Sequence, residues 1–256
     1  MDKKYKEPKP SKSIVFIGDN FINTYIYENF KRYSNVKPSI YKNINEIKHS
    51  YDIIMDCSFN QKSQDDTIKY ATDNKISKIL LVNHWKRDLK NIDNLIIIQI
   101  IVPDVYGTEH MSFYRPGSGN NYDSEINFCT LICESIRKIH ESKYDLLPLT
   151  YIFYGEDKVK YIYVENLYEP INYIVNEINS NCYFEIYDEE KSVNEILSII
   201  KDVIDYRGQI VFENTESIYN KSVKKLDYKH NYKPFRNMVK TIYQYLLCEN
   251  DRFKIS

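Results

Sequence analysis

The stretch that decides the fold is Ile14 to Asn23, IVFIGDNFIN, in which an apolar strand runs directly into a turn at Gly18. The following residues, 24–30, have the pattern of a helix, so the order is strand, glycine turn and helix. This order is typical of a turn that binds a dinucleotide when its spacing is Gly-x-Gly-x-x-Gly. Here the spacing is kept, but Asn20 and Asn23 stand at the second and third glycine positions.

Three side chains weaken a phosphate site at this turn. The second glycine of the intact motif lets the backbone approach the pyrophosphate, and the third lets the helix pack closely on the strand. Side chains at Asn20 and Asn23 obstruct one or the other, and Asp19 adds a carboxylate that opposes anion binding at a helix N-terminus. Since asparagine tolerates positive φ, the turn itself can form. We expect Gly18, Asn20 and Asn23 to form a structural turn; intact cofactor binding is the alternative.

The balance of charge does not favour nucleic acid or anionic membranes as partners. The chain has 256 residues with 35 basic and 36 acidic side chains, which leaves a formal net charge of −1. No run of about 18 apolar residues is present, and the first residues, MDKKYKEPKPSKS, are polar, so we expect neither a transmembrane helix nor a signal peptide. Five cysteines without framework spacing agree with a reducing compartment, and we predict a soluble cytoplasmic protein.

Residue usage is skewed toward Ile, Lys, Asn and Tyr, with 25 tyrosines and alanine only at Ala71. This bias indicates an AT-rich genome, which adds tyrosine and lysine throughout the chain without selection for chemistry. Motifs built from these two residues are therefore weak indicators of function.

Short apolar runs alternate with helical stretches in the first half of the chain, as in βαβ units. The expected strands of this half are residues 14–17, 39–41, 53–56, 78–82 and 95–102. Helices are expected at residues 65–74, 124–141, 193–203 and 234–247, with strand or strand-helix segments at 150–154, 160–178 and 183–187. We predict an α/β fold: a Rossmann-like parallel sheet with helices on both faces and a small C-terminal lobe.

The predicted organisation has three parts. Residues 1–12 form a flexible tail whose lysines solvate it, and a specific partner site there is the weaker alternative. Residues 13–114 form the Rossmann-like core, to which residues 160–180 return. Residues 115–159 and 181–256 form the C-terminal, substrate-type lobe.

Six segments spread along the chain match, in order, the motifs of one family. They are IVFIGDNFIN, YDIIMDCSFN, IIIQIIVPDVYG, YIYVENLYEPINYIV, YFEIYDEEKSVNEILSII and YKHNYKPFRNMVKTIYQYL. The chain resembles the extended short-chain dehydrogenase/reductase family, specifically its nucleotide-sugar epimerases and 4,6-dehydratases. The fourth segment, residues 161–175, is similar to the family's Tyr-Val-Asp-Asp strand and helix and is the most specific match. The resemblance implies an NAD or NADP cofactor and a nucleotide-sugar substrate.

The main departure from this family lies at residues 83–94, NHWKRDLKNIDN. There the family has a strand ending in a catalytic Ser or Thr, then a long crossover helix with the Tyr-x-x-x-Lys pair. A parallel crossover needs about a dozen residues or more, so this segment cannot also hold that helix. The catalytic helix is therefore expected to be absent. Four Tyr-x-x-x-Lys pairs occur elsewhere, none after the corresponding strand: Tyr27/Lys31, Tyr33/Lys37, Tyr154/Lys158 and Tyr187/Lys191.

Cofactor and substrate anchoring are weakened as well. The resemblance places an acidic residue after the second strand for the adenosine ribose, whereas residues 41–43 are Tyr-Lys-Asn. Val159 stands where the family often has an arginine near the sugar-nucleotide phosphates, so the flanking Lys158 and Lys160 are the substrate-binding candidates. We expect no cofactor; NAD or NADP is the alternative that the resemblance implies.

The carboxyl ends of the expected strands meet at one potential cleft, because ligands of doubly wound sheets bind there. This cleft would be lined by residues 18–23, 57–60, 83–85 and 103–106. His84 with Asp104 is a candidate acid/base pair, since histidine titrates near neutrality, and Tyr106 is a further candidate. The alternative, which we favour, is that His84 begins a surface turn and Asp104 caps the next one, which leaves the catalytic residues unknown.

Two other groupings have plainer explanations. Cys129 and Cys133 lie four apart on an expected helix, as metal ligands sometimes do, and His110 or His140 would have to complete the site. Buried free thiols are the favoured interpretation, and we predict no metal. The loop at residues 115–123, RPGSGNNYD, could close over a ligand, and an ordinary surface loop is the favoured alternative.

Two functions are consistent with these observations. The first is a noncatalytic or regulatory relative, a pseudoenzyme that keeps the scaffold for protein contacts, pairs with an active sugar-nucleotide enzyme, and retains residual nucleotide or nucleotide-sugar binding. The second is a nucleotide-sugar epimerase or dehydratase with relocated catalytic groups. The joint loss of two glycines, the ribose acid and the catalytic helix favours the first. The oligomeric state is left open, because the family commonly dimerises through the region that is shortened here.

Overall fold

The computed structural model describes residues 12–84, 86–107, 131–143, 148–151, 155–212, 225–228 and 233–253. The chain divides into two compact units, each of which is described by itself. The first comprises Met1–Ile100 with Ile171–Tyr183, and the second comprises Ile101–Pro170 with Phe184–Ser256. The domain boundaries expected from the sequence stay a prediction.

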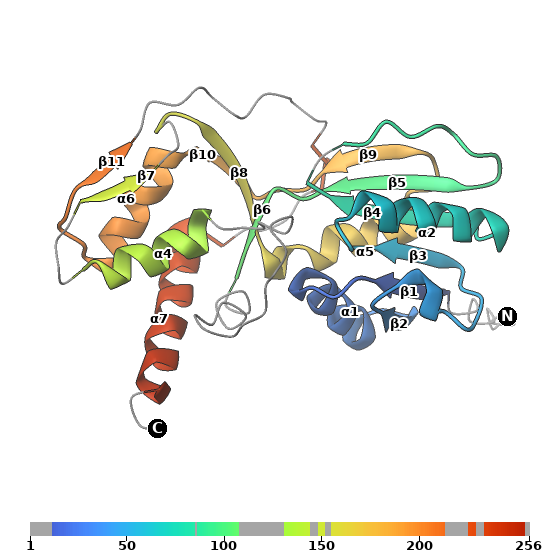
Figure 1. Cartoon of the computed structure of the whole chain (residues 1–256), viewed down its shortest axis with the longest axis horizontal. Helices are drawn as coiled ribbons and strands as arrows, with labels where there is room; N and C mark the ends of the chain where they lie inside the picture. The colour runs from blue at the N-terminus through green and yellow to red at the C-terminus, as the bar shows by residue number, and fades with distance from the viewer. Residues whose placement is uncertain are drawn as a thin grey trace, which may run out of the picture. The chain divides into compact units, whose positions relative to one another are not determined.

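The first unit is built on a six-stranded sheet with the order β2-β1-β3-β4-β5-β9 (Figure 1). Its strands are β1 (Ser13–Ile17), β2 (Lys37–Tyr41), β3 (Ile53–Asp56), β4 (Lys78–Asn83), β5 (Ile96–Ile101) and β9 (Cys182–Glu185). The pairs β1/β2, β1/β3 and β3/β4 are parallel. Because β1 lies between β2 and β3, the direction in which strands are added reverses at β1, as in a doubly wound sheet.

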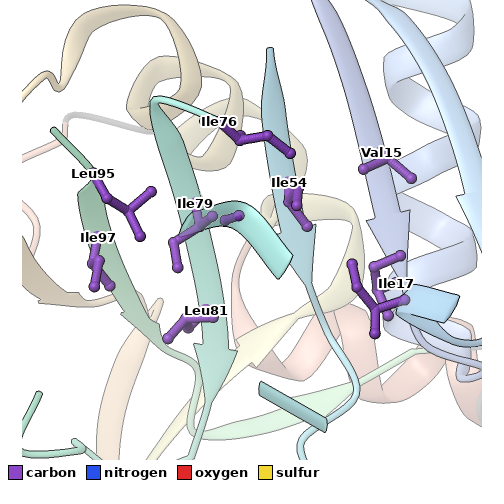
Figure 2. Packing of buried hydrophobic residues seen from close by; sticks show 10 residues of the cluster. Val15, Ile17, Ile54, Ile76, Ile79, Leu81, Leu95 and Ile97 are labelled. Atoms are coloured by element: carbon purple, nitrogen blue, oxygen red, sulfur yellow. The ribbon is translucent and has the colours of Figure 1, made fainter. Parts of the chain in front are cut away.

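Helices cover both faces of this sheet. Alternate residues of a strand point to opposite faces. Val15 of β1 shares a buried cluster with Ala71 of α2 (Gln61–Asp73) and with Ile54 and Ile79 of the neighbouring strands (Figure 2). The adjacent residue Phe16 packs instead on Phe30 of α1 (Phe21–Tyr33), with ring centroids 5.4 Å apart. The predicted α/β, Rossmann-like class is therefore confirmed.

A buried lysine attaches α5 (Tyr168–Glu177) to the first unit. The Nζ of Lys78, at the start of β4, donates to the backbone oxygens of Ile174, Val175 and Ile178 at 3.1, 2.8 and 2.5 Å. These carbonyls lie at the C-terminal end of the helix, where a cation is favourable. Burial lowers the pKa of Lys78 to about 8.

The described residues of the second unit form two small sheets. The strands β6 (Asp104–Tyr106), β8 (Lys158–Tyr163) and β10 (Glu189–Ser192) form a sheet with the order β10-β8-β6. In it β6 pairs parallel with β8, and β10 pairs antiparallel with β8. A parallel pair joins β7 (Leu149–Tyr151) to β11 (Ile210–Phe212).

Three helices of the second unit pack on one another: α4 (Leu131–Glu141), α6 (Val193–Ile204) and α7 (Phe235–Phe253). A capping box begins α6, in which Ser192 and Glu195 each bond the other's backbone N–H. Two short 3-10 helices lie at Ile44–Glu46 in the first unit and at Val164–Asn166 in the second. Among the described residues, no helix is both long enough and apolar enough to cross a membrane.

Most expected elements form, with shifted ends. The helix expected at residues 65–74 begins at Gln61, because the Asn60 side chain caps it by accepting from the Ser63 N–H at 3.0 Å. The final helix extends beyond residue 247 to Phe253. The sequence pattern missed β10, since its four residues, EEKS, carry no apolar side chain.

Candidate functional site

Two turns follow the carboxyl ends of β1 and β3, residues 18–23 and 57–60, and we call them the switch-point turns. Both belong to the first unit. The strand order reverses between these two strands, and open α/β sheets bind their ligands at such a point. The switch-point turns are therefore the first place to look for a site.

Gly18 is required by both its backbone conformation and its surroundings. Its φ is +128°, which L side chains rarely adopt. A Cβ at this position would lie 2.9 Å from the backbone oxygen of Cys57. The N–H of Gly18 donates to the backbone oxygen of Tyr41 at 3.0 Å, at the end of β2. The turn that the sequence predicts does form, and it packs tightly against the turn after β3.

Asn20 connects the two switch-point turns. It is the N-cap of α1, and its Oδ1 accepts from the Asn23 N–H at 2.9 Å. Its Nδ2 donates to the backbone oxygen of Cys57 at 2.5 Å. One carboxamide thus satisfies the start of the helix and bridges the ends of β1 and β3.

Asn23 is buried in the first turn of α1, with no exposed surface. Its Nδ2 donates to the backbone oxygen of Gly18 at 2.7 Å. Its Oδ1 is buried and has no hydrogen-bond partner in the described part of the chain. A buried acceptor without a partner costs about 1–3 kcal/mol, so the burial of this oxygen lowers the stability of the folded chain.

These residues do not fit a dinucleotide as the intact motif does. In that motif glycines leave room for the pyrophosphate, and the backbone N–H groups of the helix N-terminus face it. Here the Asn23 N–H, in the first turn of α1, already donates to Asn20. The two carboxamides are bonded within the switch-point turns, to Cys57 and Gly18, rather than being free to move aside.

An exposed ion pair follows β1 and β2. The Nζ of Lys42 lies 2.6 Å from Oδ2 of Asp19, and both side chains are more than two-thirds exposed. An exposed pair contributes little stability. It does neutralise the carboxylate that the sequence placed beside the expected phosphate position.

A buried carboxyl at the end of β3 was missed by the sequence analysis. Asp56 accepts from the Ser58 N–H at 2.8 Å and from Oγ1 of Thr67 at 2.5 Å. Burial raises the pKa of Asp56, and it also raises the pKa of the neighbouring Cys57 thiol. The available signal was an acid ending the apolar run IIMD, followed two residues later by serine.

The connection between β4 and β5 is short, with twelve residues from His84 to Leu95. Its described residues, 84 and 86–95, contain no helix. The Gln99 side chain holds it by pairing with the backbone of Arg87: Oε1 accepts from its N–H at 2.8 Å, and Nε2 donates to its oxygen at 2.9 Å. We call this contact the Gln99 clasp.

The Arg87 side chain ties the same connection to α2. It is 8% exposed, and its Nη2 lies 2.5 Å from Oδ1 of Asp65. Its Nη1 donates to Oε1 of Gln64 at 3.3 Å. Gln64 in turn accepts from Nδ2 of Asn83 at 2.9 Å and donates to the backbone oxygen of Val82. The sequence analysis missed this network, because its members are ordinary polar residues far apart along the chain.

His84 packs on an aromatic ring. It stacks on Phe59 with ring centroids 5.0 Å apart and an interplanar angle of 13°. Phe59 is buried and has a φ of +56°, which is uncommon for a bulky residue. Asp104 belongs to the second unit, so neither unit by itself contains the candidate acid/base pair.

Tyr106, the other catalytic candidate, is a core residue of the second unit. It is 1% exposed and packs on the rings of Tyr161, Tyr163 and Phe235. Burial raises its pKa far above the usual tyrosine value. A hydroxyl in this environment stays protonated near neutral pH and is poorly matched to acid/base work.

Both substrate-binding candidates are paired with carboxylates. Lys158 Nζ lies 3.6 Å from Oε2 of Glu195, and Lys160 Nζ lies 2.7 Å from Oε2 of Glu185. Lys160 also lies over the ring of Tyr187, 5.1 Å from its centroid. Whether either lysine binds a substrate stays a prediction.

The remaining motifs are placed only in part. Lys31 lies over the Tyr27 ring on α1, and Lys191 pairs with Glu189 at 2.7 Å. Tyr154, Trp85, Cys129, His110 and residues 115–123 lie outside the described residues. Within the described ranges, no three His, Cys, Asp or Glu side chains are grouped to hold a metal ion.

The fold and the switch-point turns define a class: a Rossmann-like α/β chain whose glycine turn is filled by asparagine. No family model matches the sequence, and no curated protein matches it either.

Several solved structures share this fold. One is a GDP-mannoheptose C4 reductase from Campylobacter jejuni with NADP bound, 13% identical, with a TM-score of 0.64 over 92% of this chain and 98% of that chain. Another is a GDP-L-fucose synthetase from Naegleria fowleri bound to NADP, 11% identical, with a TM-score of 0.63 over 94% of each chain. A third is the UDP-glucose 4-epimerase of Thermotoga maritima with UDP-glucose, 11% identical, with a TM-score of 0.61 over 93% and 99%. The chain therefore has the fold of nucleotide-sugar reductases and epimerases.

Proposed function

We propose that this chain is a noncatalytic relative of the nucleotide-sugar epimerases and reductases, which keeps their scaffold for protein contacts. The observation that carries the proposal is the β4–β5 connection of twelve residues. In the family that the sequence resembles, the acid/base tyrosine and its lysine lie on a long helix in this place. A segment of this length barely completes a parallel crossover and cannot hold that helix as well.

Side-chain hydrogen bonds hold the short β4–β5 connection in its observed conformation. The Gln99 clasp bonds the backbone of Arg87 on both sides, and the Arg87 guanidinium bonds two residues of α2. Backbone groups held by a buried carboxamide are costly to release. A catalytic group brought in by rearranging this segment would have to break these bonds.

The glycine turn after β1, where the resemblance would place a cofactor, agrees with this proposal. The neighbouring solved structures from Campylobacter jejuni and Naegleria fowleri are described with NADP bound. In this chain the asparagine side chains occupy the glycine turn, and Lys42 pairs with Asp19 after β2. Any nucleotide or nucleotide-sugar binding that remains is expected to be weak and without turnover.

The test is an activity assay on the full chain with NADPH or NADH and a panel of GDP, UDP and dTDP sugars. The Naegleria fowleri synthetase, assayed in parallel, serves as the positive control. We expect no oxidation of the reduced cofactor and no new sugar nucleotide. Turnover by this chain would overturn the proposal, and its loss in His84→Ala would support an enzyme with relocated groups.

The proposed partner is an active sugar-nucleotide enzyme of the same organism. Size-exclusion chromatography of the two purified proteins, alone and mixed, tests it. We expect a new, earlier-eluting species that contains both chains. Unchanged elution of each protein at concentrations well above micromolar would remove this partner from the proposal.

A further inference from the structure

We infer that Asn20 and Asn23 act as an intramolecular stopper at the switch-point turns, and that removing their side chains opens this point to a dinucleotide. The inference rests on the proposed function, which treats the chain as a relative that no longer uses a cofactor. It goes further by naming the two groups that exclude the ligand. It also states that the exclusion is reversible by substitution.

The first step of the argument is the position of the contact. The strand order of the sheet reverses between β1 and β3, and this is where doubly wound sheets bind ligands. The Asn20 carboxamide spans this same point, from the N-cap of α1 to the backbone oxygen of Cys57 at the end of β3. A ligand lying across the two turns would compete directly with this bond.

The second step concerns the groups that would receive an anion. A helix N-terminus binds phosphate through the free N–H groups of its first turn. In α1 the Asn23 N–H is already satisfied by Oδ1 of Asn20 at 2.9 Å. The first turn of this helix contains no acidic residue, and the Asp19 carboxylate just before the helix is paired with Lys42, so the block is made by neutral side chains.

The third step is the unusual state of Asn23. This side chain is fully buried, and its Oδ1 has no partner in the described part of the chain, while its Nδ2 holds the backbone oxygen of Gly18. A buried acceptor without a partner is a cost that a purely structural turn would avoid. Glycine at this position would remove the cost and restore the close approach of helix and strand that the intact motif has.

Folding is expected to survive the substitutions that test the stopper. Glycine is tolerated at an N-cap with a loss of only a few tenths of a kcal/mol relative to asparagine. Asn20→Ser is a second, milder variant, because serine keeps an N-cap acceptor but lacks the nitrogen that reaches Cys57. A matched control is Ser192→Gly, since Ser192 caps α6 through the same kind of bond, to the Glu195 N–H, and lies outside both switch-point turns.

The experiment measures NADPH and NADH binding by isothermal titration calorimetry for the full chain and these variants. We expect the Asn20→Gly/Asn23→Gly double variant to bind the dinucleotide about tenfold or more tighter than the wild type. Asn20→Ser should show a smaller gain, and Ser192→Gly should show none. Circular dichroism and thermal unfolding establish that each variant is folded.

Two results would overturn the stopper. One is that Asn20→Ser and the double variant both bind the dinucleotide no more tightly than the wild type. If the double variant does not fold, the same result in Asn20→Ser alone is sufficient. The other is an equal gain in Ser192→Gly, which would trace the effect to general loosening of helix caps. Neither result bears on the proposed function, which turnover by the wild-type chain would overturn by itself.

Discussion

At the scale of single residues, the site is defined by side chains that bond to backbone. Asn20 and Gln99 each place a carboxamide against backbone groups from another part of the chain, and Asn23 places one against the nearby Gly18 oxygen. The Asp56 carboxylate accepts from the nearby Ser58 N–H. Groups used in this way fix the turns and the connection that they bond.

Gly18→Ala is expected to destabilise the chain by about 1–3 kcal/mol, since it combines a strained φ with a backbone clash. The added Cβ would meet the Cys57 oxygen at 2.9 Å, and backbone cannot move aside as a side chain can. Gly155→Ala is the control, because the atoms nearest its Cβ would belong to the Phe212 side chain, from 3.2 Å. Urea unfolding compares the two, and equal losses would contradict the account of Gly18.

Asp56→Asn is expected to change how stability depends on pH. Burial raises the pKa of Asp56 above its ordinary value of 3.8, so the folded state holds this proton more tightly than the unfolded state does. The stabilising effect of the proton is therefore present at low pH and is lost as the pH rises through the raised pKa. The asparagine variant should gain stability relative to wild type over that interval.

Urea unfolding of wild type and Asp56→Asn between about pH 4 and pH 8 measures this difference. Asp66→Asn, which changes an exposed acid on α2, is the matched control. If the free energies of unfolding of wild type and Asp56→Asn change in parallel with pH across the range, Asp56 does not cause the pH dependence of stability.

At the scale of elements, the decisive feature is the connection between β4 and β5. Residues that follow a parallel strand usually form a helix before the next strand begins. Here the chain turns back within twelve residues, and Gln99 and Arg87 hold it to β5 and α2. The described residues of this connection form no helix, and side-chain bonds hold it instead.

Gln99→Leu should cost about 1–3 kcal/mol of unfolding free energy, because it leaves the N–H and carbonyl of Arg87 without their partner. Gln61→Leu, at an exposed position on α2, should change stability by less than about 0.5 kcal/mol. Chemical denaturation provides both numbers. A Gln99→Leu variant as stable as Gln61→Leu would mean that the clasp contributes nothing.

At the scale of the whole molecule, the first unit is assembled from two segments far apart in the sequence. Residues 171–183 return to the sheet formed by residues 1–100. Lys78 bonds the end of α5, and Asn181 Oδ1 accepts from the Ile97 N–H at 2.7 Å. Asn181 also donates to Oδ1 of Asn91, in the β4–β5 connection, at 3.1 Å.

Asn181→Ala is therefore expected to lower stability by about 1 kcal/mol, since it releases both long-range bonds. Asn179→Ala is the control, because Asn179 bonds only the nearby Glu177 oxygen, at 3.4 Å. Hydrogen exchange of the Ile97 amide, read by NMR, should become faster in Asn181→Ala and not in Asn179→Ala. Equal exchange in the two variants would contradict a tie between the segments.

Much of the fold could be read from the sequence, because strands and helices have local signals. The apolar runs at residues 14–17, 53–56 and 78–82 and the turn at Gly18 are periodic or steric patterns within a few residues. The short β4–β5 connection could also be counted directly from the chain. The polar network of Gln64, Arg87 and Gln99 could not, because no pattern in the sequence says which polar residues become buried together.

The sequence by itself determined the α/β class, the strand-turn-helix at Gly18 and the twelve-residue length of the β4–β5 connection, since each depends on residue order and spacing alone. Only the tertiary structure decided what the asparagines do. Asn20 reaches Cys57 because parallel pairing places the ends of β1 and β3 side by side, whereas Asn23 turns back to Gly18 within the same turn. The bonds that fill the turn depend on distances between strands, and these exist only in the folded chain.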